Sequence, residues 1–83
     1  MKERDDVEIR YSKQATKFLK KQPKQIQYRI ITAINKLPDG DVKKLQGEPY
    51  YRLRVGDFRI LFSKTGEVLI IEKIGNRGEV YKD

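Results

Sequence analysis

Arginines recur at alternate positions of a segment that otherwise has the composition of a buried β-strand. Within residues 50–55, Arg52 and Arg54 fall on one face of the expected strand, while Leu53 and Val55 fall on the other. The planar fork of N–H donors on a guanidinium fits phosphate oxygens, and its flat face stacks on nucleobases. This spacing therefore indicates an anionic ligand of the nucleic-acid kind, on which the same charges could also assist chemistry at a phosphate.

A third arginine is expected directly opposite the second. Gly56-Asp57 predicts a two-residue hairpin turn, and the register that follows from it places Arg54 opposite Arg59. Like charges at opposite positions destabilise a strand pair, and an anion bound between them would remove that cost. The alternative is a solvated outer face of an antiparallel sheet, where arginine is common.

Other candidates are weaker when each is taken alone. Arg77 lies between Gly75 and Gly78, in a predicted loop that would let the backbone approach a ligand closely. Tyr81 offers a ring for stacking on a base, although taken alone it is better explained as a half-buried edge residue. A group of lysines around the end of the first expected helix is interpreted as its solvated side, with phosphate contact as the alternative: Lys17, Lys20, Lys21 and Lys24.

Composition limits the functions that this chain can have. The 83 residues include 19 Lys+Arg against 12 Asp+Glu, and the net charge of +7 is typical of a protein with a polyanionic or acidic partner. A merely solvated basic surface explains the charge equally well when the charge is taken alone. The absence of cysteine excludes disulfides and zinc–thiolate sites, and the absence of histidine removes the commonest general base. No segment has the pattern of a signal peptide or a membrane span, so we expect a single soluble, cytoplasmic domain over residues 1–83.

The elements that would position the arginines follow from apolar periodicity. Ser12 is an expected helix N-cap, and Pro23 separates two helices that each carry one apolar stripe. A turn at 38–41 and a connector at 43–49 precede the arginine segment. Helices are predicted over 13–22 and 24–37. Strands are predicted over 7–11, 50–55 and 58–62, over the apolar run 68–71 with an end at Gly75, and, as a short last strand, over 79–81. The order β-α-α-β-β-β(-β) predicts an α+β fold, with a helical hairpin packed on one face of an antiparallel sheet and the arginines on the other.

Five short motifs, in this order and spacing, resemble the RelE/ParE superfamily of bacterial toxins. The resemblance covers nearly the whole chain and is greatest to the RelE-type mRNA endonucleases of type II toxin–antitoxin systems. The motifs are Lys44–Gly47, Tyr51–Val55, Asp57–Phe62, Gly75–Arg77 and Glu79–Tyr81. The resemblance implies a toxin that cleaves mRNA in the ribosomal A site and leaves 2′,3′-cyclic phosphate and 5′-hydroxyl ends. It also implies that no metal or other cofactor is needed. The partners would be mRNA, the ribosome with its 16S rRNA, and a cognate antitoxin, with no membrane involved.

The same resemblance implies separate roles for the site residues. Arg52 and Arg54 fall where the best-known member has lysines, one of which is a proposed general base. Arg59 falls on the arginine that stabilises the scissile phosphate, Arg77 on a proposed general acid or charge stabiliser, and Tyr81 on the tyrosine that stacks on the base. The expected catalytic residues are thus Arg52, Arg54, Arg59, Arg77 and Tyr81, and the expected RNA-binding residues are Lys43, Lys44, Arg52 and Arg54.

The identity of the general base stays open at this stage. Arginine keeps its proton near neutral pH, and the chain has no histidine. Tyr81, a group of the RNA or ribosome, or a mechanism that depends mainly on positioning and charge are the alternatives. Two other functions also stay open: a ParE-like toxin that inhibits DNA gyrase without nuclease activity, and a basic RNA- or ribosome-binding module without catalysis.

Overall fold

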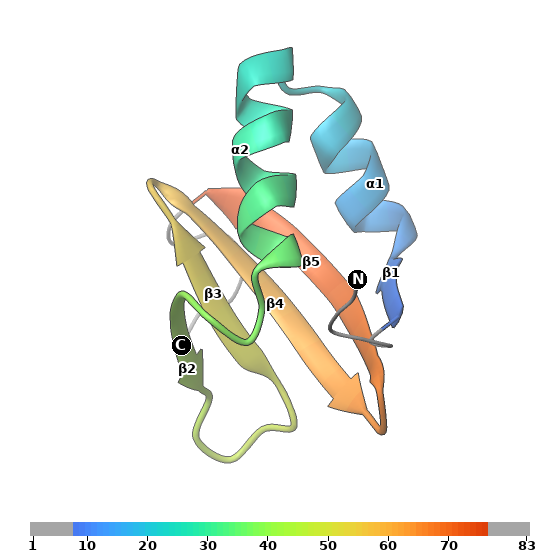
Figure 1. The fold of residues 1–83 in the computed structure, drawn as a ribbon, viewed down its shortest axis with the longest axis vertical. Coiled ribbons are helices and arrows are strands. Elements are labelled where there is room, and N and C mark those ends of the chain that lie inside the picture. Colours follow the sequence, from blue (N-terminus) through green and yellow to red (C-terminus); the bar gives the residue numbers. More distant parts are fainter. Residues whose placement is uncertain (1–7, 77–83) are drawn as a thin grey trace, which may run out of the picture.

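A computed structural model describes residues 8–76, which form a layer of two helices on a five-stranded sheet (Figure 1). The order across the sheet is β1-β5-β4-β3-β2. Both helices cover the same face, as the sequence predicted, and neither is long and apolar enough to cross a membrane. The elements are β1 (Glu8–Tyr11), α1 (Lys13–Lys20), α2 (Lys24–Asn35), β2 (Asp41–Lys44), β3 (Tyr51–Val55), β4 (Phe58–Thr65) and β5 (Val68–Asn76). The last strand expected at 79–81 lies outside the described residues.

The sheet is mixed rather than wholly antiparallel. Strands β2 to β5 are antiparallel neighbours, which was expected for β3, β4 and β5. Strand β1 instead pairs in parallel with β5, with Ile9 opposite Leu69. The two helices carry the chain across the sheet after β1, so β1 is not bound to its neighbour by a hairpin. A short alternating segment indicates a strand but contains no information about the direction of its partner.

Residues 41–44 form an additional strand where the sequence predicted a turn and a connector. Gly40, with φ of 122°, belongs to the turn, and β2 begins at the next residue. Val42 packs against the core, while the other side chains of β2 are exposed. The prediction of a connector was wrong because an edge strand that buries one side chain in four has almost no apolar alternation to detect.

Strand β5 extends to Asn76, past the apolar run at 68–71 and one residue past Gly75, where the sequence predicted its end. Its register against β4 shifts at Glu72, which has no opposite residue. This bulge resets the alternation, so Ile71 and Ile74 are both buried although they are three positions apart. The polar pair Glu72-Lys73 therefore resembles the end of an apolar run but lies within the strand.

The start of α1 is fastened to this bulge through two polar side chains. Ser12 Oγ accepts a hydrogen bond from the Ala15 N–H at 3.1 Å, which confirms the predicted N-cap, and donates to the Glu72 carbonyl at 2.7 Å. The Gln14 side-chain amide donates to the Ile74 carbonyl and accepts from the Ile74 N–H, each at 3.0 Å. These contacts fix the orientation of the helical hairpin on the sheet.

The core lies between the helices and the sheet. Leu53 on β3 and Ile60 on β4 are almost fully buried there, and they are opposite each other in the strand pairing. Because side chains alternate along a strand, the neighbours of these two residues point to the face that the helices leave uncovered. The buried residues with least exposure are Ala15, Ile30, Ile34, Leu53, Ile60, Ile71 and Ile74.

Candidate functional site

The sheet face opposite the helices carries a cluster of cations on neighbouring strands. These cations, together with one carboxylate, are called the arginine face: Asp41, Lys43, Arg52, Arg54 and Arg59. Asp41 is opposite Arg54, Arg54 is opposite Arg59, and Lys43 is opposite Arg52. Four side chains predicted from the sequence to bind RNA or act on it therefore lie together on one surface.

The register of the arginines depends on the turn between β3 and β4. Gly56 has φ of 58°, in the left-handed region that favours glycine, and the flanking strands pair from the first residue on either side of the turn. The guanidinium of Arg29 lies against this turn, because a Cβ added to Gly56 would be 2.9 Å from Arg29 Nη2. The predicted opposition of Arg54 and Arg59 is confirmed by this pairing.

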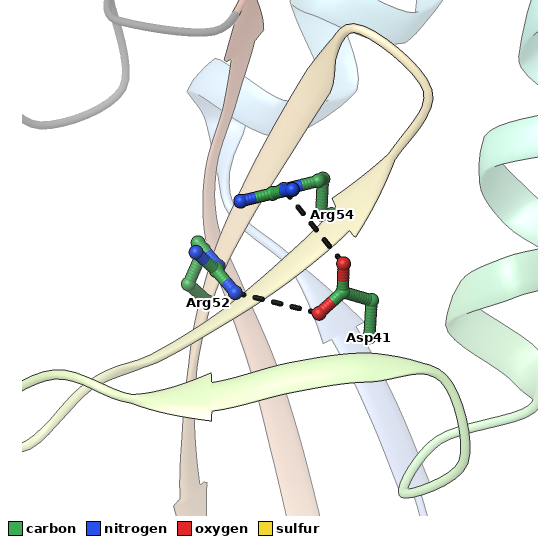
Figure 2. A network of polar contacts seen from close by, with 3 residues as sticks. All are labelled: Asp41, Arg52 and Arg54. Carbon is green, nitrogen blue, oxygen red and sulfur yellow. Dashed lines mark hydrogen bonds and ion pairs between the residues drawn. The ribbon is translucent and has the colours of Figure 1, made fainter.

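Asp41 lies between two of the guanidiniums (Figure 2). Its Oδ1 is 3.5 Å from Arg52 Nη2 and its Oδ2 is 3.7 Å from Arg54 Nε. Both arginines come from β3, whereas Asp41 reaches them from the edge strand. One carboxylate thus offsets part of the charge of the arginine face and restrains the orientation of two of its guanidiniums.

Arg52 is the most buried cation of the arginine face. It is 7% exposed, and its Nε is buried without a hydrogen bond to any described residue. By contrast, the side chain of Arg54 is 44% exposed. A buried guanidinium with an unused donor is costly in the free protein, and its attraction to an anion is screened less than that of an exposed one. Arg52 therefore has the character of an internal anion-binding group, and Arg54 that of an accessible one.

The two expected RNA-binding lysines lie on different faces of β2. Lys43 is exposed on the arginine face, opposite Arg52. Lys44 is opposite Tyr51 and therefore on the helix side, where its Nζ donates to the Glu48 carbonyl at 3.1 Å and lies 5.8 Å from the centre of the Tyr51 ring. Both lysines border a hollow of about 530 Å³ that Arg52 also lines. Lys43 belongs to the arginine face, and Lys44 lies at its margin.

Sequence reasoning missed two residues of this surface. Asp41 was assigned to a turn, and only the pairing of β2 with β3 brings it opposite Arg54. Lys73 on β5 is opposite Leu61 and extends the surface by one strand, but it follows the apolar run at 68–71 and was not singled out. The signal that was available is the alternation in Asp41-Val42-Lys43, in which one apolar residue separates two charged ones.

Two predicted site residues, Arg77 and Tyr81, lie outside the described residues. The described chain ends beside the arginine face, because Gly75 on β5 is opposite Arg59 on β4. The roles of Arg77 and Tyr81 therefore stay predictions.

The arginine face is suited to binding and charge stabilisation rather than to proton transfer. Arginine keeps its proton, and Arg52, Arg54 and Arg59 together outnumber the one carboxylate between them. Burial raises the pKa of the Tyr11 hydroxyl, but Tyr11 is on β1, two strands away from β4. Within residues 8–76, no group of three His, Cys, Asp or Glu side chains could hold a metal ion. What the surface can do is bind a phosphate and stabilise additional negative charge on it.

Comparison with known proteins places this geometry among toxins. A family model described as the ParE toxin of the type II toxin–antitoxin system, parDE, matches residues 9–81. Toxin RelE3 of Methanocaldococcus jannaschii is 30% identical over 84 residues, which cover 90% of this chain and 96% of that protein. A chain in the archaeal RelE–RelB complex from Pyrococcus horikoshii is similar with a TM-score of 0.73 and 28% identity, over 89% of this chain and 98% of that one. A chain in the RelB–RelE antitoxin–toxin complex from Methanococcus jannaschii has a TM-score of 0.68 and 29% identity, over 81% and 88%.

Proposed function

The chain belongs to the RelE/ParE superfamily as a RelE-like toxin of a toxin–antitoxin system, and we propose that it is a metal-independent endoribonuclease that cleaves mRNA in the ribosomal A site. The observation that supports this activity best is the arginine face. Arg54 and Arg59 are directly opposite each other, and Arg52 lies buried beside them on the same surface. A protein that only needed a stable sheet would gain nothing from this arrangement.

The proposed reaction is an in-line displacement at a phosphate of the RNA. The 2′-oxygen attacks phosphorus and loses its proton, the bond from phosphorus to the 5′-oxygen breaks, and the 5′-oxygen gains a proton. The products are a 2′,3′-cyclic phosphate and a 5′-hydroxyl. Arg54 and Arg59 would stabilise the negative charge that grows on the phosphate oxygens, and Arg52 would add a less screened charge.

The roles of the remaining residues follow from this assignment. Asp41 positions Arg52 and Arg54 without contacting the reacting atoms. Arg77 is proposed to stabilise charge or donate the proton to the leaving oxygen, and Tyr81 to stack on the base and orient it. Because arginine keeps its proton and the chain has no histidine, catalysis by the described residues would depend on positioning and charge rather than on a general base.

A cognate antitoxin is the expected protein partner. Two of the similar structures are complexes of a RelE toxin with its RelB antitoxin. An acidic or amphipathic segment of that partner would suit a basic surface of this chain. We place the protein in the cytoplasm, where mRNA and ribosomes are found.

Substitution of the arginines tests the proposal. Arg59→Ala and Arg77→Ala should each lower the rate of mRNA cleavage by about 100-fold or more, because one charge-stabilising donor is typically worth that much. Both should also abolish growth arrest on induced expression, with circular dichroism showing that they fold. Lys64→Ala is the matched control, since Lys64 is exposed near the far end of β4 and should keep full activity. Toxicity of both arginine variants equal to that of the unsubstituted protein would refute the proposal.

The ParE family match supports a second candidate function, inhibition of DNA gyrase without RNA cleavage. That function would not need the arginine face to act on a scissile phosphate. Purified protein that blocks gyrase supercoiling and leaves mRNA intact would establish it in place of the nuclease. Gyrase supercoiling that is unaffected by the protein, together with cleaved mRNA, would exclude gyrase inhibition.

A further inference from the structure

The positive charge of the protein is concentrated in its helical layer. Residues 12–38 contain seven lysines or arginines and no aspartate or glutamate, so the rest of the chain carries twelve residues of each sign. The helical layer therefore accounts for the whole net charge of +7. This layer covers the sheet face opposite the arginine face (Figure 1), so the two basic regions lie on opposite sides of the molecule.

On α1 the charges form one stripe that points away from the sheet. Ala15 and Leu19 are buried against the core, whereas Lys13, Lys17 and Lys20 are exposed. Spacings of four and three residues put these three lysines on one side of the helix, opposite the buried pair. The stripe is about 10 Å long, at 1.5 Å of rise per residue.

The outward side of α2, which lies beside α1 in Figure 1, also carries exposed residues. Lys24 is exposed in the first turn, and Tyr28 follows one turn later. Tyr28 is 74% exposed and is the one large hydrophobic residue that the described chain leaves exposed. The lysine face is defined as Lys13, Lys17, Lys20, Lys24 and Tyr28.

Helix stability explains only part of this distribution of charge. Lys17 and Lys20 are in the last turn of α1, where the helix dipole favours cations. Neither helix has an acidic residue in its first turn, and Lys13 and Lys24 stand where the helix dipole favours an anion. Lys13 and Lys17 are like charges at a spacing of four, which destabilises a helix when no carboxylate lies between them. Helix stability therefore does not explain Lys13 and Lys24, and a polyanion bound to the lysine face would reduce the repulsion between its lysines.

We propose that the lysine face binds the phosphate backbone of folded RNA, as a second contact surface separate from the arginine face. Lysines on a regular helix present point charges that suit phosphates without selecting a sequence, and an exposed tyrosine among them can stack on a base or ribose. The inference extends the proposed ribosomal function and depends on it only for naming ribosomal RNA as the folded RNA. It explains how mRNA could occupy one side of the protein while the ribosome holds the other.

An acidic protein segment fits the lysine face less well than RNA does. Protein interfaces are depleted of lysine and are centred on apolar or aromatic anchors. The lysine face offers one such anchor. A more suitable surface for a protein lies on the uncovered part of the helix-side sheet face, where an apolar hollow is lined by Leu37, Val42, Tyr51, Phe62 and Leu69.

Binding of a double-stranded RNA tests the inference without relying on cleavage. The probe is a fluorescent RNA duplex of about 20 base pairs, long enough for shape-based backbone contacts, and anisotropy is measured over a series of KCl concentrations. The triple variant Lys13→Gln/Lys17→Gln/Lys20→Gln should bind about tenfold more weakly or worse. The slope of log K against log[KCl] should fall by about 2–3, which is close to one for each phosphate that the variant no longer neutralises. The matched variant Lys13→Arg/Lys17→Arg/Lys20→Arg should retain affinity and slope.

The outcomes separate this inference from the proposed nuclease function. A glutamine variant that folds and binds the duplex with unchanged affinity and salt slope would overturn the inference. The inference would also be overturned if the glutamine variant bound the duplex as before but no longer bound poly-glutamate. The lysine face would then be a binding surface for an acidic protein. Cleavage of single-stranded mRNA by the unsubstituted protein is measured separately. If the nuclease proposal fails, duplex binding by the variants still tests the role of the lysine face.

Discussion

The turn at Gly56 offers a quantitative test of the geometry that aligns the arginines. Gly56 has φ of 58°, and a Cβ added there would be 2.9 Å from Arg29 Nη2 and 3.2 Å from Arg29 Cζ. Gly66 in the next turn has φ of 60°, and a Cβ added there would meet nothing within 4 Å. The two glycines have nearly the same backbone conformation, and they differ in whether a side chain covers them.

Alanine at either position must adopt the left-handed conformation. We expect Gly66→Ala to lower the free energy of unfolding by about 1–2 kcal/mol from that strain alone. Gly56→Ala should lose the same amount and a few tenths of a kcal/mol more, because the exposed, flexible end of Arg29 must move aside. In a domain of this size, each 1 kcal/mol corresponds to a fall of about 4–8 °C in Tm.

Urea denaturation of the two variants, each with and without Arg29→Ala, measures the cost of the backbone strain and the cost of displacing Arg29 separately. In the Arg29→Ala background, Gly56→Ala and Gly66→Ala should cost the same. Gly56→Asn should recover part of the loss, since asparagine tolerates this conformation better than alanine does. A cost below about 0.3 kcal/mol for Gly56→Ala would show that the left-handed turn, and with it the register of Arg54 against Arg59, is incorrect.

Three further predictions concern the helix cap and the arginine face. Ser12→Ala should lower the free energy of unfolding by about 1–2 kcal/mol, because it removes both the N-cap and the hydrogen bond to the Glu72 carbonyl. Denaturant titration measures this loss, and an unchanged midpoint would contradict the structure. Asp41→Asn should lower the free energy of unfolding by about 0.5–1 kcal/mol, because it weakens two partly exposed ion pairs. It should tighten RNA binding, since it adds net positive charge, and slow cleavage, since Arg52 and Arg54 are held less firmly. Binding and cleavage that change in the same direction would argue against a positioning role. Lys43→Gln should reduce the salt slope of single-stranded RNA binding by about 0.7, whereas Lys64→Gln should leave it unchanged; equal effects of the two would show that charge alone, not position, determines binding.

The sequence predicted the parts of the fold in which residue pattern and geometry coincide. Ser12 was identified as a cap because its residue type and position match the backbone donor that it satisfies. The opposition of Arg54 and Arg59 followed from the turn, since a two-residue loop fixes the register of a hairpin. The helical layer followed from apolar stripes that are buried as expected.

The remaining features depend on contacts between distant segments. The strand at β2 buries only Val42, so its existence is determined by pairing with β3 rather than by its own composition. The extension of β5 depends on the bulge at Glu72, which changes the alternation that a strand prediction assumes. For the same reason, the ion pairs of Asp41 and the deep burial of Arg52 could not be predicted: both require an edge strand that the sequence pattern does not reveal.

The most direct test of the central claim is the chemistry of RNA ends after purified protein acts on mRNA bound to ribosomes. The proposed function predicts new 3′ ends with 2′,3′-cyclic phosphates and new 5′-hydroxyl ends, both of which should disappear with Arg59→Ala. Intact mRNA in the presence of folded, unsubstituted protein would contradict the claim that the arginine face is a site of RNA cleavage.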